Sequence, residues 1–277
     1  MTTQTSTFQP TFLQKLLGRN YKWWYLFVYA FKSNTAYRWS SFSWLVSRLL
    51  TLLATILIWY VSSINGFELF DFKFIFTYYI VGTMFSINNT LLYGLADDIK
   101  SGKISRVLLL PSNSWLQMYI GNLGWNIFSI SSEFLLVGIL GVIGFKFLLL
   151  PANPLVFLLF LACNLLGYFI LVLTNFLIGS LAFFITDIWG LIDLQSTFRV
   201  HLSGKTIPLN ILPALLPLSF LPFAFTFYHP MQIYLGKYSA LETLFVFLGG
   251  IAWCVILYFL AKLVFKMGLK RNESVGL

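Results

Sequence analysis

The segment LVFLLFLACNLLGYFILVLTNFLIGSLAFFI, residues 155–185, decides the fold class of this 277-residue chain. It runs without one charged side chain, and about 20 mostly apolar residues are enough to cross a bilayer as a helix. A run of this length is expected to tilt or to project beyond the membrane. Pro151 and Pro154 precede it and Asp187 follows it, so both of its ends are marked.

The composition of the whole chain agrees with a membrane protein. Hydrophobic residues make up 58% of the chain and charged residues 10%, with a mean hydropathy of +0.82. Soluble domains average about 45–50% apolar and about 25% charged residues, so these values exclude a soluble fold, a disordered chain and a disulfide scaffold. The two cysteines, Cys163 and Cys254, lie inside apolar runs and offer no disulfide framework. We therefore predict an all-α membrane protein.

Six membrane-spanning helices are predicted. Besides residues 155–185, they cover residues 42–64, 72–95, 116–145, 188–202 and 241–264. Each run is predominantly apolar and ends at charged residues, prolines or a polar turn.

Residues 207–227 are also apolar but are broken by prolines. The prolines of this region are Pro208, Pro213, Pro217 and Pro222. One straight helix cannot hold them, and irregular backbone is tolerated at membrane depth only where protein or a cavity surrounds it. We predict a re-entrant helical hairpin at one membrane face, between the fifth and sixth spans.

The N-terminal part of the chain precedes the spans. Residues 1–10 are polar and are expected to be disordered, whereas residues 11–38 interleave basic and aromatic side chains. A basic helix with an aromatic side suits the headgroup plane of a membrane, so an interfacial elbow helix is predicted there. Residues 39–277 then form a single transmembrane domain.

The basic residues indicate how the chain is oriented. The net charge of +9 comes from 18 Lys and Arg against 9 Asp and Glu. In a soluble protein this excess would suggest nucleic acid as a partner, but here most basic residues fall on one side of the predicted spans. Cytoplasmic flanks of membrane helices collect Lys and Arg. We therefore predict a multi-pass protein of the cell membrane, with both termini cytoplasmic and no nucleic-acid partner.

A charged segment, DDIKSGKISR, separates the second and third predicted spans at residues 97–106. One interpretation is a solvated cytoplasmic loop. The other is a short amphipathic helix, since apolar residues alternate with the charges, and such a helix could dock in a groove on a soluble partner. The residues assigned to this docking role are Asp97, Asp98, Ile99, Lys100, Gly102, Lys103 and Arg106.

Polar residues inside the spans are costly and face protein or water. The third span carries such residues on one helical face, at steps of four, three and four: Asn122, Asn126, Ser129 and Glu133. The second span carries a similar stripe: Ser86, Asn89 and Tyr93. Helix packing and a solvated substrate path are both compatible with these stripes.

The fifth predicted span holds two further charges, Asp193 and Arg199. Six residues apart, they point about 120° away from each other on a helix and do not pair along it. We hypothesise that Arg199 pairs with Glu133 across the third and fifth spans.

No catalytic or metal-binding set is present in the sequence. The two histidines, His201 and His229, lack a metal-ligand spacing. Gly204-Lys205-Thr206 resembles the end of a phosphate-binding loop, but that loop needs a glycine where this chain has Arg199. We predict that the chain is not an enzyme and binds no metal or cofactor.

The order of several short motifs is informative. Ala36-Tyr37-Arg38 precedes the first span, Asp98-Ile99-Lys100-Ser101-Gly102-Lys103 leads to Leu108-Leu109-Leu110-Pro111, and the fourth span ends in Thr186-Asp187-Ile188. Ser203-Gly204-Lys205-Thr206-Ile207-Pro208-Leu209 then precedes Leu221-Pro222-Phe223 and Tyr228-His229-Pro230. In this order and topological placement, the chain resembles the membrane subunit of an ABC-2 type ABC transporter, with the type V exporter fold.

The resemblance implies a dimer of permease subunits, identical or paralogous, and two separate cytoplasmic ATPase subunits that bind ATP and magnesium. It implies that residues 97–106 are a coupling helix on the ATPase and that the re-entrant hairpin gates the outer end of the path. The gate residues it suggests are Ser203, Gly204, Pro208, Pro213 and Pro222.

Three functions are weighed on this basis. The first is ATP-driven export of an amphipathic or hydrophobic molecule, such as a drug, peptide, lipid or lipid-linked glycan. The second is an ion-coupled secondary transporter that uses Glu133, Asp193 and Arg199; it is disfavoured because only the C-terminal half is interrupted. The third is a membrane assembly factor without transport. Substrate contacts are expected at Asn89, the polar face of the third span and the same three charges.

Overall fold

The structure is a computed structural model of the 277-residue chain. It describes residues 24–25, 28–29, 32, 38–64, 71–86, 91–105, 114–211 and 213–273. Every regular element within these residues is a helix. The N-terminal residues 1–10 and nearly all of the predicted elbow lie outside the described residues, so both predictions stay predictions.

Eight α-helices are bounded within the described residues. They are α3 (Arg38–Ile64), α4 (Phe72–Met84), α5 (Leu91–Lys100), α7 (Ser114–Ile143), α8 (Pro154–Ser180), α9 (Trp189–Leu202), α10 (Tyr228–Tyr234) and α11 (Ala240–Glu273). Short 3₁₀ helices join some of them: η2 (Phe145–Phe147), η3 (Leu181–Phe183), η4 (Pro213–Phe220) and η5 (Pro222–Thr226).

The starts of α8 and α11 follow from local capping chemistry. At the start of α8, the Asn153 side chain accepts a hydrogen bond from the Val156 N–H at 2.8 Å. Ser239 and Glu242 exchange backbone and side-chain hydrogen bonds at the start of α11, at 2.7 and 3.2 Å. Both arrangements satisfy N–H groups that have no partner inside the helix.

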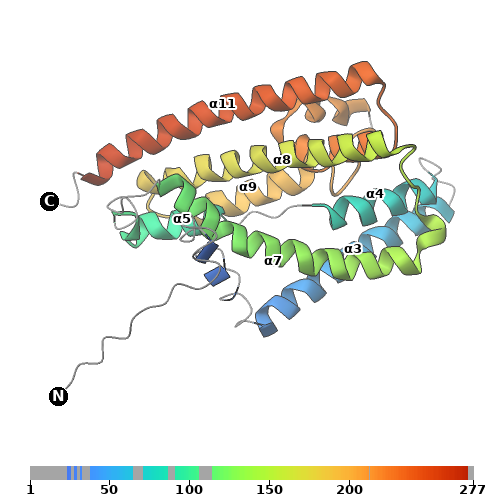
Figure 1. The fold of residues 1–277 in the computed structure, drawn as a ribbon, viewed down its shortest axis with the longest axis horizontal. Coiled ribbons are helices and arrows are strands. Elements are labelled where there is room, and N and C mark those ends of the chain that lie inside the picture. The colour runs from blue at the N-terminus through green and yellow to red at the C-terminus, as the bar shows by residue number, and fades with distance from the viewer. Residues whose placement is uncertain are drawn as a thin grey trace, which may run out of the picture.

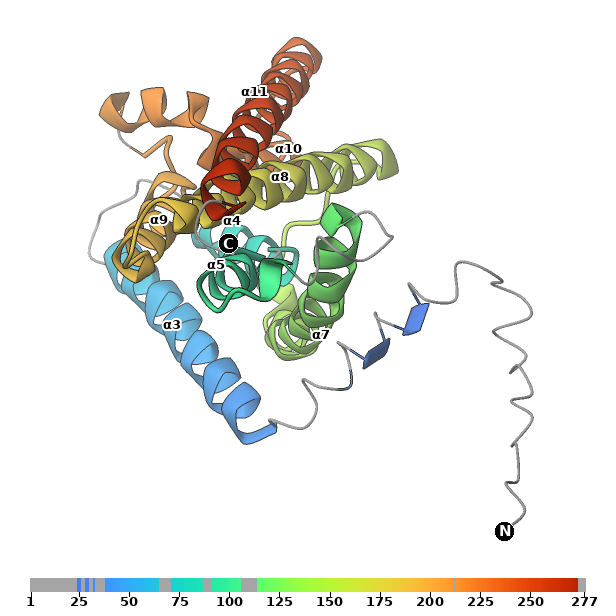
Figure 2. The same ribbon diagram turned by 90° about the vertical axis from the view of Figure 1, so that its left-hand side faces the viewer.

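Helix α4 occupies the centre of the bundle. Figure 2 looks along the bundle and shows α3, α7, α8, α9 and α11 arranged around α4 and α5. Ten consecutive residues of α4, 74–83, are buried. A helix that is apolar on all sides is expected in this position, because it has no face to give to lipid or water.

Helix α8 forms a second spine. It packs on α11 and also contacts α5, α10 and η5, and Figure 2 shows α8 and α11 close together near the C-terminal end of α11 and diverging toward their other ends. The main core cluster joins α4 to α8 and α10 through residues such as Tyr79, Phe160 and Met231. A smaller cluster surrounds α5 near the C-terminal end of α11, with Ile104, Ile188 and Phe265.

Three helices of the described chain are long and apolar enough to cross a membrane. The apolar windows are Leu45–Ser62, Pro154–Phe183 and Ala240–Arg271, and Ile130–Ile143 in α7 is a shorter apolar stretch. The number of six spans therefore stays a prediction. That the chain is a membrane protein does not depend on this number.

Two predicted helices have different bounds in the structure. The continuous helix over residues 72–95 is wrong, because α4 ends at Met84 and α5 begins only at Leu91. The intervening sequence contains Ser, Asn and Thr residues, which compete with the helical backbone for hydrogen bonds.

The separate helix predicted over residues 97–106 is also corrected. Residues 97–100 are the last turn of α5, and Gly102 follows with φ of +72°. A left-handed residue ends an α-helix, and glycine adopts it without steric strain. Residues 103–105 are helical again, so the segment is the end of one helix, a turn at residues 101–102 and the start of another helix.

The proline-rich region forms short helices, as its prolines require. Residues 207–227 contain η4 and η5, and α10 follows directly. A 3₁₀ helix uses short segments and tolerates Pro217 where a long α-helix does not. The placement of this region at a membrane face stays a prediction.

Candidate functional site

A small polar cavity lies inside the bundle, where α3 and α9 meet the end of α4. Its volume is about 60 Å³. Three basic side chains line it: Arg48 from α3, Arg199 from α9 and Lys205 from the loop after α9. Hydroxyl-bearing residues complete its polar wall, namely Ser86, Ser203 and Thr226. Segments far apart in the sequence therefore build a single site.

The carboxylate next to this cavity belongs to Glu133 of α7. Its side chain is 3% exposed, and Arg48 Nη1 donates a hydrogen bond to Glu133 Oε1 within an ion pair. The hypothesis that Arg199 pairs with Glu133 is corrected, because the ion pair of this carboxylate comes from α3. A sequence pattern misses Arg48, since one arginine near the start of an apolar run is typical of a cytoplasmic flank.

Two tyrosines of α4 hold the loop that carries Lys205. The Tyr78 hydroxyl donates to the Gly204 carbonyl at 2.7 Å. The Tyr79 hydroxyl donates to the Thr206 carbonyl at 2.8 Å. Gly204 has φ of +78°, and a Cβ there would lie 3.1 Å from Tyr78 Oη. Because the loop approaches α4 this closely, position 204 has no room for a side chain. The next residue, Lys205, lines the cavity.

The environment of Lys205 lowers the pKa of its ammonium group. Its Nζ lies 5.7 Å from the centre of the Phe227 ring. Burial lowers the pKa of Lys205 to about 8; the positive charges of Arg48 and Arg199 also lower this pKa, and Glu133 opposes them. The lysine is therefore mostly charged at neutral pH and loses its charge only slightly above it.

Ser86 adds to the cavity a hydroxyl that makes no hydrogen bond to the described residues. It follows the end of α4 and is 8% exposed. Its Oγ has no hydrogen-bond partner within the described part of the chain, although it lines the cavity. A buried hydroxyl without a partner costs about 1–3 kcal/mol relative to a satisfied one.

A second candidate site lies at the end of α5, near the C-terminal end of α11 (Figure 1). Ile99 is 7% exposed and Ile104 is fully buried, and both belong to the smaller core cluster. Asp97 and Lys103 point outward, with 62% exposed side chains and a distance of 3.7 Å between Oδ2 and Nζ. The segment therefore has an apolar face in the bundle and a charged face outside it.

Asp98 occupies the boundary between these two faces. Its pKa is raised, chiefly by partial burial and to a smaller extent by Asp97, whereas Lys103 lowers it. Lys100 and Gly102 are exposed beside it. Arg106, the last residue of the predicted coupling segment, lies outside the described residues.

The comparison with protein families decides what kind of protein this is. A family model described as ABC-2 family transporter protein matches residues 42–276. The chain belongs to the ABC-2 transporter family. A search of curated proteins found no match.

Membership identifies this ABC-2 protein as an integral membrane permease and a component of a transport system, with no catalytic role of its own. Permeases of this family generally work with ATPase subunits. No group of three or more His, Cys, Asp or Glu side chains in the described parts of the permease is placed to hold a metal ion. The predicted absence of a bound cofactor stays a prediction.

The predicted polar path of the permease is only partly visible. Glu133 and Arg199 both lie at the cavity region, whereas Asp193 is exposed on α9 and does not line it. Asn89 lies outside the described residues. The backbone of α7 includes Asn122, Asn126 and Ser129, but their side chains are not among those described.

The predicted gate residues fall into two groups. Ser203 and Gly204 are buried in the loop held by the tyrosines. Pro208 is buried farther along the loop, Pro213 begins η4, and Pro222 is buried at the start of η5. The structure thus places Ser203 at the polar cavity, and a gating role for the group stays a prediction.

Proposed function

We propose that this chain is the permease subunit of an ATP-driven exporter that moves an amphipathic or hydrophobic molecule out of the cytoplasm. One observation carries the proposal beyond family membership: the two-faced segment at residues 97–105. Its isoleucines are buried in a cluster that also holds side chains of α8, α9 and α11, and α5 packs directly on α8, while the charged side chains Asp97 and Lys103 are exposed to a soluble partner. A push on this segment would therefore be transmitted to the helices.

The proposed assembly contains two permease subunits and two cytoplasmic ATPase subunits, with ATP and magnesium bound by the ATPases. The surface of helix α9 is an argument for a second permease subunit. Asp193 is exposed on this helix beside the large apolar side chains of Leu194 and Phe198. An exposed carboxylate on an intramembrane helix needs a partner or water. The second subunit, identical or paralogous, would cover this face.

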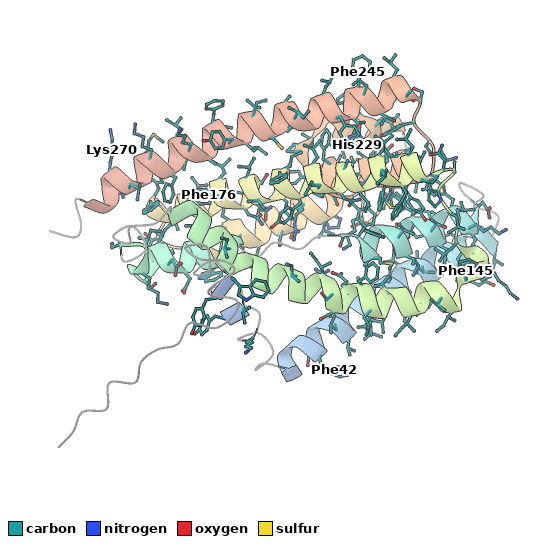
Figure 3. All side chains as sticks on the ribbon, in the orientation of Figure 1. Phe42, Phe145, Phe176, His229, Phe245 and Lys270 are labelled. Atoms are coloured by element: carbon teal, nitrogen blue, oxygen red, sulfur yellow. The ribbon has the colours of Figure 1, made fainter. Side chains whose placement is uncertain are left out.

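The test begins with purification of the tagged chain from its own cells. An ABC ATPase is expected to co-purify, and the double variant Asp98→Ala/Lys103→Ala is expected to lower substrate-stimulated ATP hydrolysis by about fivefold or more, a common size for coupling between sites. Lys146→Ala is the matched control, since Lys146 is exposed on η2 next to Phe145, which lies at the opposite end of the bundle from α5 (Figure 3).

Three results would contradict the proposal. The first is a double variant that folds, keeps its ATPase and hydrolyses ATP with unchanged stimulation. The second is transport without any ATPase that collapses with the proton gradient, which would favour an ion-coupled transporter. A chain that supports no transport at all, with or without an ATPase, would favour an assembly factor.

A further inference from the structure

The polar cavity is strongly biased in charge. Arg48, Arg199 and Lys205 line it, and Arg48 is paired with Glu133 of α7. Among the described residues, these four side chains carry a net formal charge of plus two when Lys205 is protonated. Partly buried side chains of like charge repel each other strongly, because little water screens them. Their grouping at this cavity therefore needs an explanation.

The shape of the cavity suits a small anionic group. One water needs about 10–15 Å³ of such space, so a cavity of about 60 Å³ holds roughly four water-sized groups. A phosphate group has this size, whereas a whole drug or peptide does not. Guanidinium groups such as those of Arg48 and Arg199 bind phosphate oxygens through paired N–H donors, and an ammonium adds a point charge.

A neutral hydrogen-bond donor at the cavity indicates the same ligand. The Ser86 hydroxyl is buried at the cavity and has no partner among the described residues. An oxygen-rich anion would accept this hydroxyl's hydrogen bond. A phosphate monoester carries a charge of about −1.5 to −2 at neutral pH and three acceptor oxygens, so it matches the cavity in both charge and donors. A carboxylate or a phosphate diester would leave one positive charge in excess.

We propose that this cavity binds the phosphate monoester group of an anionic amphiphile. The group would lie between Arg199 and Lys205, with Ser86 as a third donor, and the apolar part would extend past Phe227. As a statement about the transported substrate, the proposal rests on the export function proposed above. Binding of the phosphate group itself does not.

The loop geometry makes this a built site. Lys205 is held at the cavity by the hydrogen bonds from Tyr78 and Tyr79 to the backbone on either side of it. Tyr228 N–H also donates to the Ser203 carbonyl at 3.0 Å and closes the loop from the other side. A loop fixed in this way loses little backbone freedom on binding, which favours affinity.

The test measures binding to the purified full chain in detergent, without any ATPase. The probes are hexyl phosphate, a soluble amphipathic monoester, and dihexyl phosphate, the corresponding diester. Hexyl phosphate is expected to bind saturably and more tightly than the diester at equal salt. Arg199→Gln and Lys205→Gln should each weaken it on the order of tenfold, the scale of a charged hydrogen bond, and Lys146→Gln should leave it unchanged.

A pH series separates a role in binding from a role in structure. The groups that face Lys205 are Arg48 of α3, Glu133 of α7 and Arg199 of α9, and the Tyr78 hydroxyl of α4 binds its loop. The second pKa of a phosphate monoester is about 6, and any further ionisation of hexyl phosphate above pH 7 would strengthen binding, so a weaker affinity at pH 9 than at pH 7 reports the protein. With a pKa of about 8, wild-type affinity should fall about tenfold over this range.

Lys205→Arg keeps its charge and should bind with no such pH dependence. Because this variant keeps the positive charge, it tests the site without the risk that loss of a charge unfolds the protein. Phosphatidic acid in nanodiscs identifies the source of the group: competition with hexyl phosphate would assign a bilayer lipid, and undiminished hexyl phosphate binding would assign a soluble or transported amphiphile. Either result supports the site.

The proposal is overturned if hexyl phosphate does not bind the folded wild-type chain, or if it binds the Arg199→Gln and Lys205→Gln variants equally well. A diester that binds as tightly as the monoester would overturn the assignment of a monoester. Because no ATPase is present, these failures leave the co-purification test of the exporter untouched.

Discussion

Single residues in this permease owe their roles to partners that lie far away in the sequence. Glu133 is an intramembrane carboxylate in the sequence, but the structure turns it into the counter-ion of Arg48, a residue 85 positions earlier. His229 is buried at 7% exposure between the Ser219 carbonyl and the Tyr238 hydroxyl, at 2.8 and 2.9 Å (Figure 3). Both residues yield predictions that depend on charge.

Glu133→Gln should lower the free energy of unfolding by about 3 kcal/mol, because Arg48 would keep its charge next to two other cations without its counter-ion. The measurement is chemical unfolding in detergent micelles. Arg48→Gln/Glu133→Gln removes both charges and should recover much of the loss. Additive losses in the double variant would contradict the ion pair.

The stability of the permease should fall in mild acid because of His229. Burial lowers the pKa of His229 to about 4, from an ordinary value of about 6.5. Between these values the unfolded chain binds the proton and the folded chain does not, so stability decreases as the pH drops. From pH 7 to pH 5 the loss attributable to His229 is about 2 kcal/mol.

Unfolding measured at these two pH values checks this prediction. His229→Gln keeps a polar side chain but does not titrate, so its unfolding free energy should change less over the same range. An equal pH dependence in wild type and variant would show that other groups are responsible.

At the scale of elements, the breaks between helices are as informative as the helices. The interruption after α4 puts Ser86 at the polar cavity, and the turn after α5 lies between the buried Ile99 and the buried Ile104. Continuous helices in these places would remove both features. Hydrophobic periodicity predicts where helices run but is weak at their ends, where polar residues and glycines decide.

The two glycines of this region should respond to alanine in opposite directions. Gly102 has φ of +72°, so Gly102→Ala forces an unfavourable left-handed alanine and should destabilise the protein by about 1 kcal/mol. Gly94 lies inside α5 with open space around it, so Gly94→Ala should stabilise by up to about 1 kcal/mol. Thermal unfolding of the two variants compares them directly; a Gly102→Ala variant as stable as the wild type would contradict the assigned helix end.

At the scale of the whole molecule, the long axis of the bundle is the direction expected to cross the membrane. Helix α11 has 34 residues and is therefore about 50 Å long, well beyond the hydrocarbon thickness of about 30 Å. Its C-terminal end, near Lys270, lies at the same end of the molecule as α5, and Phe145 lies at the opposite end (Figures 1 and 3).

This arrangement predicts the accessibility of single cysteines. In a background with Cys163→Ala and Cys254→Ala, Lys270→Cys should react with an impermeant thiol reagent only after the cells are opened. Phe145→Cys, 59% exposed in the structure, should react in intact cells. Labelling of both positions from the same side would contradict the orientation and the direction of the bundle.

Composition by itself determined that this chain is a helical membrane protein, because the need to satisfy the backbone in lipid leaves an apolar chain few alternatives. The charged run at residues 97–106 also stood out, since charge in so apolar a chain is visible without a structure. Only the tertiary structure decided that Arg48 binds Glu133, and that the paired tyrosines of α4 bring Lys205 to a cavity. The reason is physical: hydrophobicity and charge are local properties of a segment, whereas burial and the choice of a partner depend on which helices pack together.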